Sequence, residues 1–341
     1  MAFVKLKAWS CVLALLCAGV FDCAALPAAE GALPEDYYER VKPACVEILG
    51  DGHLDGSGWI AEADGVVVTA AHVVRTQERH FEVILADGER LEAHVIAIDR
   101  GRDVALLRIP AREKGYPILP FAEKTPPAGR DIYLYGAPIQ RHHVLLRGTV
   151  GRNDSTFEFY TWLYDYVEII HITGCGPPGT SGGPWLNERA EVVGLNSGMM
   201  RDGNAPAGVA FLAPASSIRA ILKDKRSAET ATLGAAVEEI WQQPRDFIAR
   251  FPPRTEGLVI VMPRADGPAV RAGLRERDVI ISADGVAMRQ PDSLLRMVRL
   301  KKPGDEIKLK IIPLIEGSPK EVTVRLDNLE TSWKEEPVRK K

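Results

Sequence analysis

The sequence has few cysteines and no pattern of metal ligands. Three of the five cysteines lie within the first 23 residues, so only Cys45 and Cys175 remain in the rest of the chain. Spacing alone cannot place these two within bridging distance, so their pairing stays open. His142 and His143 are adjacent, and neighbours on a strand point to opposite faces, which makes them a poor chelating pair. We therefore expect neither a bound metal nor a cofactor.

A large net charge is also lacking. The 43 Lys and Arg residues nearly balance the 46 Asp and Glu residues, which gives a formal net charge of −3 at pH 7. Nucleic-acid binding needs concentrated positive charge, so this balance gives no support for it. The short basic end, residues 339–341, is interpreted as solvated. With 341 residues, 46% hydrophobic and 26% charged, the chain allows two globular domains.

The N-terminus has a different composition from the rest of the chain. Lys5 and Lys7 precede an apolar run over residues 8–21, and small residues follow. This layout is typical of a secretory signal peptide, and the run is short for a membrane span. We predict a signal peptide over residues 1–25, cleaved after Ala25, and hence an exported protein, periplasmic or secreted. An uncleaved membrane anchor is the less favoured alternative.

Short apolar segments, separated by glycine, aspartate and proline, dominate the next part of the chain. Such segments predict strands, and Asp64-Gly65 and Asp87-Gly88 predict hairpin turns. Many short strands favour a sandwich or barrel, and a proline-rich bridge over residues 110–127 separates two sets. We therefore expect two β-barrels with a cleft between them. The predicted strands span residues 46–49, 58–61, 66–69, 81–85, 94–98, 131–135, 147–150 and 166–170.

A serine stands among glycines at Gly179-Thr180-Ser181-Gly182-Gly183. Glycine permits close backbone approach and unusual dihedrals, so the amides of Gly179 and Ser181 can converge on a developing oxyanion. The alternative is a glycine-rich surface turn. A serine hydroxyl is a weak nucleophile until a base takes its proton. Upstream stretches supply a histidine, His72, after Thr69-Ala70-Ala71, and an aspartate, Asp103, before an apolar run.

These motifs occur in the order His72, Asp103, Ser181 and resemble those of the trypsin-fold serine proteases, most closely the HtrA family of protease–PDZ proteins. The resemblance implies a catalytic triad in which Ser181 attacks a peptide carbonyl. His72 would act as general base and acid, and Asp103 would hold its tautomer. The oxyanion hole would use the amides of Gly179 and Ser181. Thr180 between them stands where many family members carry Asn.

The resemblance extends to the substrate channel. The stretch 193–199 resembles the strand that pairs with the substrate backbone, which implies substrate-binding roles for Asn196, Ser197 and Met199. Ser197 would also donate a hydrogen bond to Asp103. The stretch 208–214 resembles the second wall of the pocket for the residue before the scissile bond.

By the same analogy, Cys175 lies near the floor of that pocket. No acidic residue is found there, so small or medium apolar side chains are favoured over Lys or Arg. The loop over residues 174–178 departs from the usual family wording because it holds Pro177 and Pro178. These prolines either rigidify the oxyanion loop or hold it in an inactive shape.

A second pattern follows a short helix expected over residues 214–222 and a charged linker. We assign residues 35–222 to the protease domain and 223–232 to the linker. Further on, three landmarks together resemble a PDZ domain, which we place over residues 233–328 as a partly open β-barrel with two helices. The fold as a whole is thus expected to be mostly β. The landmarks are Pro268-Ala269-Val270-Arg271-Ala272-Gly273-Leu274, Asp278-Val279-Ile280 and Pro303-Gly304-Asp305.

PDZ domains accept an extended peptide at a sheet edge and hold its C-terminal carboxylate in a nest of amides. The family pattern implies that Gly257, Leu258 and Val259 form this nest. The alternative is a domain that packs on the protease and binds no free peptide. Residues 329–341 are expected to form a charged tail.

Taken together, the resemblance implies an exported serine endopeptidase that degrades unfolded or damaged proteins, with the PDZ domain binding substrate or regulatory C-termini. Family members often form trimers through aromatic residues near the start of the mature chain, so a homotrimer is implied, with Tyr37 and Tyr38 in an extended lead-in over residues 31–43. Alternatively, both tyrosines pack on their own domain. The rival functions are a PDZ-based chaperone or binding protein with a gated or dormant protease domain, and a processing protease for one partner.

Overall fold

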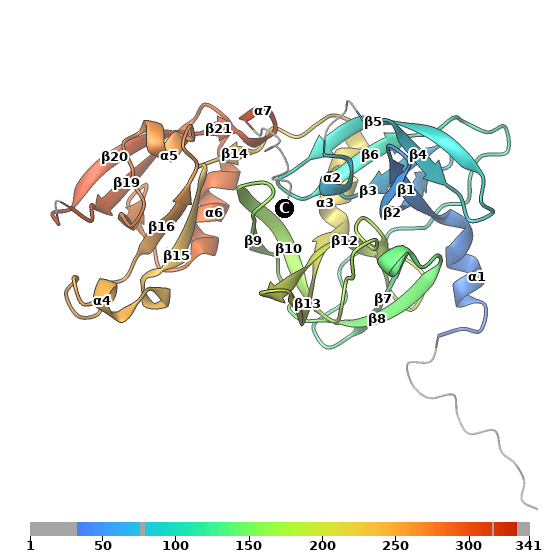
Figure 1. The fold of residues 1–341 in the computed structure, drawn as a ribbon, viewed down its shortest axis with the longest axis horizontal. Helices are drawn as coiled ribbons and strands as arrows, with labels where there is room; N and C mark the ends of the chain where they lie inside the picture. Colours follow the sequence, from blue (N-terminus) through green and yellow to red (C-terminus); the bar gives the residue numbers. More distant parts are fainter. Residues whose placement is uncertain (1–32, 76–78, 316, 333–341) are drawn as a thin grey trace, which may run out of the picture. The chain divides into compact units, whose positions relative to one another are not determined.

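Residues 45–108 form a closed β-barrel in the computed structural model, which describes residues 33–75, 79–315 and 317–332 (Figure 1). Its strands follow the order β1-β2-β3-β6-β5-β4 around the barrel. Apolar side chains fill it because every residue of β3 and most of β6 are buried. The strands are β1 (Cys45–Gly50), β2 (His53–Glu62), β3 (Val66–Thr69), β4 (Phe81–Ile84), β5 (Arg90–Asp99) and β6 (Val104–Arg108).

A second sheet of seven strands follows, in the order β13-β12-β11-β7-β8-β10-β9. An additional pairing between β10 and β13 joins two strands of this path, so that a second closed ring forms. Trp185 fills its core with Ile172 and Leu212. The strands are β7 (Asp131–Gly136), β8 (Val144–Val150), β9 (Thr156–Tyr160), β10 (Asp165–Thr173), β11 (Pro184–Leu186), β12 (Val192–Asp202) and β13 (Ala205–Pro214).

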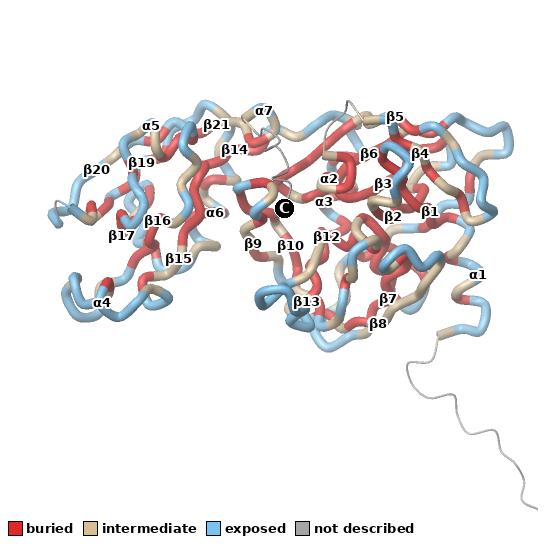
Figure 2. Tube along the Cα trace, viewed as in Figure 1, coloured by how far each residue is buried: buried red, intermediate tan, exposed pale blue. Residues whose placement is uncertain are grey.

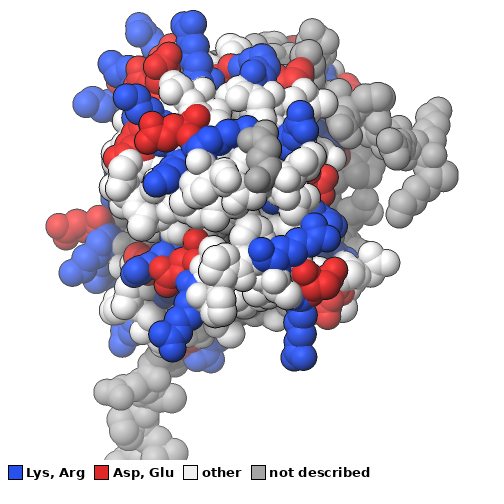
Figure 3. Space-filling view, turned by 90° about the vertical axis from the view of Figure 1, so that its left-hand side faces the viewer, with Lys and Arg blue, Asp and Glu red and all other residues white. Residues whose placement is uncertain are grey.

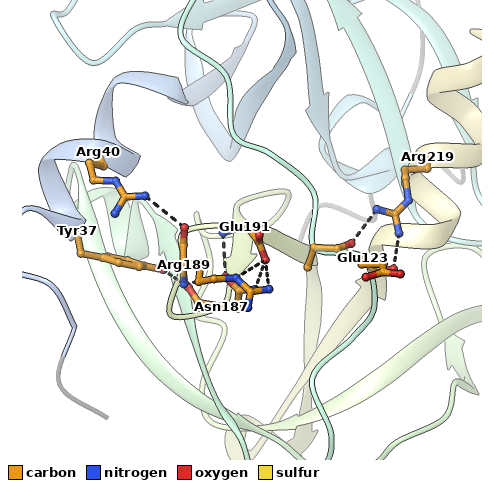
Figure 4. Close-up of polar contacts among 8 residues, drawn as sticks. Tyr37, Arg40, Glu123, Asn187, Arg189, Glu191 and Arg219 are labelled. Atoms are coloured by element: carbon orange, nitrogen blue, oxygen red, sulfur yellow. Dashed lines mark hydrogen bonds and ion pairs between the residues drawn. The ribbon is translucent and has the colours of Figure 1, made fainter. Parts of the chain in front are cut away.

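The two predicted β-barrels are thus confirmed, and each predicted strand overlaps an observed one. The helix expected over residues 214–222 is α3 (Ala215–Asp224), and its Arg219 donates to the carbonyl oxygens of Ala122 and Glu123 (Figure 4). Pro138–Gln140 forms the short helix η2. Strand β9 was not predicted, and it makes a hairpin with β10 that proves central to the site.

The predicted extended lead-in is wrong, because α1 (Tyr37–Val41) and η1 (Lys42–Ala44) are helical. Tyr37 and Val41 lie four residues apart, on one face of the helix, and both are buried. The Tyr37 hydroxyl donates to the Asn187 carbonyl oxygen at 2.7 Å (Figure 4). Tyr37 therefore packs on its own chain, as the alternative interpretation expected.

The C-terminal part forms another sheet, in the order β15-β16-β17-β19-β20, with β18 paired to β17. Helix α6 buries Leu294, Leu295 and Val298 against it. The strands are β15 (Ala235–Glu239), β16 (Leu258–Pro263), β17 (Val279–Ala283), β18 (Val286–Ala287), β19 (Glu306–Ile312) and β20 (Lys320–Arg325). The helices are η3 (Ile240–Gln242), α4 (Arg245–Ile248), α5 (Pro268–Arg271), α6 (Pro291–Leu300) and α7 (Leu329–Ser332).

This sheet shares its core with the β9–β10 hairpin. Phe157 and Tyr166 from the hairpin belong to the same buried cluster as Leu258, Ile260 and Leu294. A two-stranded sheet of β14 (Ala231–Thr232) and β21 (Asp327–Asn328) lies at the junction. Figure 2 shows the buried residues concentrated in the strands, whereas the segment around α4 is largely exposed.

The predicted charged tail is wrong for residues 329–332, which form α7 because Leu329 is apolar and fully buried. The predicted signal peptide and residues 333–341 lie outside the described residues. Within the described ranges, no helix is long and apolar enough to cross a membrane. Figure 3 shows basic and acidic side chains interspersed on the face that it presents, as the near-balanced composition predicts.

Candidate active site

His72 lies on the short helix α2 (Ala71–Val74), directly after strand β3. Ala71, Val73 and Val74 are buried, whereas about 20% of the His72 side chain is exposed. The helix ends at Arg75, whose φ of +37° breaks the helical path. This local geometry anchors α2 in the first barrel and leaves the His72 imidazole facing outward.

Asp103 lies directly before β6 and is fully buried. Its Oδ2 accepts hydrogen bonds from His72 Nδ1 at 2.8 Å and from Ser197 Oγ at 2.6 Å, and its Oδ1 accepts from the His72 backbone amide at 2.9 Å. The predicted bond from Ser197 to Asp103 is confirmed. A carboxylate can only accept, so His72 Nδ1 carries a proton and Nε2 is left to act as a base.

Tyr160 extends this chain of hydrogen bonds. Its hydroxyl lies 2.8 Å from Ser197 Oγ, and because Ser197 donates to Asp103, Tyr160 is the donor. Burial, with the Asp103 carboxylate nearby, raises the pKa of Tyr160 well above its usual value. The tyrosine therefore stays a protonated donor, and a continuous path runs from Tyr160 through Ser197 and Asp103 to His72.

The Ser181 turn packs against the first barrel. The Ser181 carbonyl oxygen accepts from the Ser57 amide at 2.8 Å. Gly182 has φ +81°, and a Cβ there would lie 2.3 Å from Thr69 Oγ1 and 2.7 Å from the Ala70 nitrogen. Since Ala70 is two residues before His72, the structure brings the serine turn to the histidine helix. Among the described residues, no hydrogen bond joins Ser181 Oγ to His72.

Gly179 has φ +93°, and its carbonyl oxygen accepts a hydrogen bond from Ser57 Oγ at 2.7 Å. This contact turns the carbonyl toward β2. Within the part of the chain that the structure describes, the amides of Gly179 and Ser181 have no protein acceptor. Two donors thus stay open at the place where the sequence predicts the oxyanion hole.

In the preceding loop, the carbonyl oxygens of both prolines accept hydrogen bonds. Pro177 accepts from the amide and from Oγ1 of Thr180, at 3.1 and 2.7 Å, and Pro178 accepts from the Ile139 amide at 2.7 Å. Thr180 itself is fully buried. These contacts fix the loop in one conformation, and they fit both alternatives for the prolines, a rigid oxyanion loop and an inactive shape.

A cavity of about 260 Å³ lies beside His72. Trp162 forms one side, with its ring centroid 6.0 Å from that of His72. Two of the predicted substrate-binding residues, Ser197 and Met199, line it, and Phe211 from the predicted second wall does so as well. The lining is thus mostly aromatic and apolar.

Asn196 and Cys175, unlike Ser197 and Met199, do not line this cavity. The substrate-binding role of Asn196 is wrong, because its side chain is fully buried and bonds Thr180 Oγ1 at 3.0 Å and Trp185 Nε1 at 3.3 Å. It supports the serine turn instead. Cys175 is exposed and does not line the cavity, so its placement at the pocket floor has no support here. Cys45 is buried, and both cysteines are free.

The carboxylate nest predicted at Gly257, Leu258 and Val259 is also wrong. Leu258 and Val259 lie on β16, which pairs with β15 on one side and β17 on the other. Both residues are fully buried. Their backbone groups face neighbouring strands, so no sheet edge is available there for a peptide.

One edge of this sheet is β15, and residues of the β9–β10 hairpin already occupy part of it. The Tyr166 hydroxyl accepts from the Val237 amide at 2.8 Å and donates to its carbonyl oxygen at 3.0 Å. Thr156 Oγ1 bonds the Asp292 carboxylate of α6 at 2.8 Å. Arg299 of α6 donates to the Tyr166 carbonyl oxygen at 2.6 Å. These contacts join both β15 and α6 to the β9–β10 hairpin.

Sequence reasoning missed the β9–β10 hairpin residues Tyr160, Trp162 and Tyr166. The signal was present as closely spaced aromatic residues from Phe157 to Tyr166, a composition typical of strands that pack on two sides. As for metals, no group of three His, Cys, Asp or Glu side chains within the described ranges is arranged to hold an ion.

Two stretches of the chain match known families. Residues 56–195 match the trypsin-like peptidase domain, and residues 232–326 match the PDZ domain. Together these stretches cover both barrels in part and all of the C-terminal sheet.

Two similar proteins are each named a probable periplasmic serine endoprotease DegP-like. That of Halomonas elongata is 29% identical over 283 residues, which cover 82% of this chain and 57% of that protein. That of Ectopseudomonas mendocina is 30% identical over 318 residues, which cover 89% and 64%. The chain therefore spans only about half to two thirds of the length of these relatives.

Solved structures share the fold. The HtrA-type protease AlgW with a decapeptide has a TM-score of 0.61 and 19% identity, covering 86% of this chain and 98% of that one. The serine endoprotease from Yersinia pestis has a TM-score of 0.58 and 20% identity, covering 87% and 99%. The chain belongs to the HtrA family, in which a trypsin-like peptidase domain precedes a PDZ domain.

Proposed function

We propose that this chain is an exported serine endopeptidase with a His72–Asp103–Ser181 triad. The observation that carries the proposal is the buried hydrogen-bonded path from Tyr160 through Ser197 and Asp103 to His72. It fixes the proton on Nδ1 and orients the ring from its buried side. This is the arrangement that a general base needs when it takes a proton from a serine hydroxyl.

In the proposed reaction, Ser181 Oγ attacks a peptide carbonyl while His72 Nε2 accepts its proton. The amides of Gly179 and Ser181, which have no acceptor among the described residues, stabilise the oxyanion. His72 then gives the proton to the leaving amine, and water completes hydrolysis by the same route. Asp103 stays ionised throughout and balances the positive charge that forms on His72.

For the substrate, we propose apolar segments of unfolded or damaged proteins. The cavity beside His72 is lined by Trp162, Met199 and Phe211, which suit small or medium apolar side chains. Such side chains are exposed when a protein loses its fold. The relatives are named periplasmic, which agrees with the signal-peptide layout and supports a periplasmic or secreted location. A homotrimer stays a prediction.

The test uses purified mature protein with unfolded casein and a fluorophosphonate probe that reacts with activated serines. We expect casein cleavage, and mass spectrometry should place the label on Ser181. Cleavage with the label on another serine would contradict the triad. If casein is not cleaved although Ser181 is labelled, the enzyme is selective, and degradation of unfolded proteins in general is the wrong function.

The rival function is a PDZ-based binding protein whose protease domain is gated or dormant. One observation favours it, namely that Ser181 Oγ makes no hydrogen bond to His72 among the described residues. This rival predicts that neither casein cleavage nor labelling of Ser181 occurs, while unfolded proteins or peptides still bind.

We further propose that peptide C-termini bind at the β15 edge in competition with Tyr166. Tyr166→Phe removes the hydroxyl that bonds the Val237 amide and carbonyl but keeps the ring in the core. A peptide then no longer has to displace two hydrogen bonds, so its affinity should rise about tenfold. Fluorescence anisotropy with a labelled peptide that ends in an apolar residue measures this.

Tyr164→Phe is the matched control, since Tyr164 lies on the same hairpin and is an exposed residue. It should bind the peptide as the wild type does. Equal affinity in all three proteins would show that the peptide does not use β15, and would support a PDZ domain that serves only as a packing partner of the protease.

A further inference from the structure

The segment that follows the C-terminal sheet returns to the second barrel. Strand β21 pairs with β14, and the Leu329 amide donates to the Thr230 carbonyl oxygen at 2.7 Å. The Leu329 side chain is fully buried in one cluster with Tyr160, Leu163 and Phe211. Two of these residues line the cavity beside His72. The last described helix, α7, is therefore fixed directly behind the candidate active site.

The next residue, Glu330, is hydrogen-bonded to Arg100, which directly follows β5 of the first barrel. Its Oε1 accepts from the Arg100 backbone amide and its Oε2 from Arg100 Nη1, both at 2.7 Å. Only 7% of the Glu330 side chain and 10% of the Arg100 side chain are exposed. Two bonds from one carboxylate to the backbone and the side chain of one residue fix both its position and its direction.

Arg100 in turn connects the two segments that carry the histidine and the aspartate. Its Nη2 donates to the carbonyl oxygen of Arg75, the residue that ends the His72 helix, at 2.7 Å. Its own carbonyl oxygen accepts from the Asp103 amide at 3.3 Å. A shift of Arg100 is thus passed to both sides of the hydrogen bond between His72 and Asp103.

We propose that Glu330 is a positioning residue for the protease, acting through Arg100 to hold His72 and Asp103 in their reactive geometry. This inference rests on the proposed triad. The segment after the PDZ domain would then help to hold the catalytic residues of the protease domain in place. The contact that couples the two domains joins Arg100 and Glu330, which are 230 positions apart in the chain.

The effect of Glu330 on kcat should depend on pH, because its carboxylate is charged only above its pKa. Burial, together with the Asp99 carboxylate nearby, raises the pKa of Glu330 to about 7, against the effect of Arg100. Among the described residues, the charged groups that face it are Arg100 and Asp99, and Asp99 is paired with Arg102 at 3.0 Å. As the pH falls through 7, Glu330 takes up a proton and its ion pair with Arg100 is lost.

The experiment compares the full chain with Glu330→Gln on a short chromogenic peptide. At pH 8 we expect kcat to fall about tenfold with KM unchanged, since Glu330 is remote from substrate but sets the geometry of the base. At pH 6 the wild type also lacks the charge, so the ratio of the two kcat values should shrink to within twofold. A ratio near one at both pH values would overturn the proposal.

Controls separate positioning from folding. Glu276→Gln removes an exposed carboxylate and should keep the wild-type kcat at both pH values. Arg100→Lys keeps the charge but cannot reach both Glu330 and Arg75, so it should lose as much kcat as Glu330→Gln, and the double variant should lose no more. Additive losses would overturn the proposal.

A second measurement reports on the His72–Asp103 hydrogen bond directly, and it can be made even if a variant is marginally stable. The low-field NMR resonance of the His72 Nδ1 proton should shift or broaden in Glu330→Gln at a temperature where circular dichroism shows a full fold. An unchanged resonance would contradict the positioning role. If wild-type protein neither cleaves the peptide nor reacts with the fluorophosphonate, it is the proposed triad that fails, which is a different result.

Discussion

Replacing Asp103 by Asn should lower kcat for peptide hydrolysis about ten-thousandfold, with a much smaller change in KM. The His72 amide needs an acceptor and bonds Asp103 Oδ1 at 2.9 Å, so an asparagine would keep its oxygen there. Its amide nitrogen would then take the place of Oδ2 and face His72 Nδ1. To accept from that nitrogen, His72 must move its proton to Nε2, where it can no longer act as the base.

The measurement is steady-state kinetics on a short peptide, with circular dichroism to show that the variant is folded. Asp202→Asn, at an exposed position in the β12–β13 turn, serves as the matched control and should leave kcat unchanged. A loss of less than tenfold in Asp103→Asn would contradict the role assigned to Asp103, because the wrong tautomer of His72 would then still support catalysis.

The triad motifs could be predicted because each depends on its immediate neighbours. The glycine-rich turn around Ser181 and the buried strand before His72 are local features that the sequence predicts and the structure has, whereas the short helix that carries His72 was not predicted. The role of Asn196 could not be predicted in this way. Whether that side chain faces a substrate or the inside of the serine turn depends on Trp185 and Thr180, which approach it only in the folded barrel.

The misplaced carboxylate nest has a similar physical origin. An apolar run such as residues 257–261 predicts a strand, but a strand at a sheet edge and one in the middle have the same sequence pattern when both faces are buried. Only the pairing of β16 with both β15 and β17 shows that this strand lies inside the sheet and not at its edge. In the same way, the buried place of Glu330 could not be read from a charged C-terminal segment, because its partner Arg100 is far away in sequence.

The hairpin of β9 and β10 explains how these separate features are joined. One part of it carries Tyr160 and Trp162 toward His72, and another part carries Phe157 and Tyr166 into the core of the C-terminal sheet. Leu329 packs against the hairpin from behind. A displacement of the C-terminal sheet must therefore disturb contacts on both sides of the hairpin, since packed cores transmit shifts rather than absorb them.

Gly179→Ala should lower kcat by a factor of about 10² to 10³, the loss that follows removal of one oxyanion donor. A Cβ at this position would lie 2.3 Å from the Ala137 carbonyl oxygen. Ala137 cannot move away easily, because its amide is held by Ser57 Oγ at 3.0 Å. The loop itself must shift, so the Gly179 carbonyl loses its bond from Ser57 and the amide turns away from the oxyanion.

Gly203→Ala separates this clash from the general strain of alanine at positive φ. Gly203 has φ +56°, and a Cβ there would meet no atom within 4 Å, so the variant carries a similar backbone cost without displacing any neighbour. It should lower the unfolding temperature slightly and leave kcat as in the wild type. An equal kcat in both variants would mean that the Gly179 amide does not bind the oxyanion, and that the second donor must come from elsewhere in the loop.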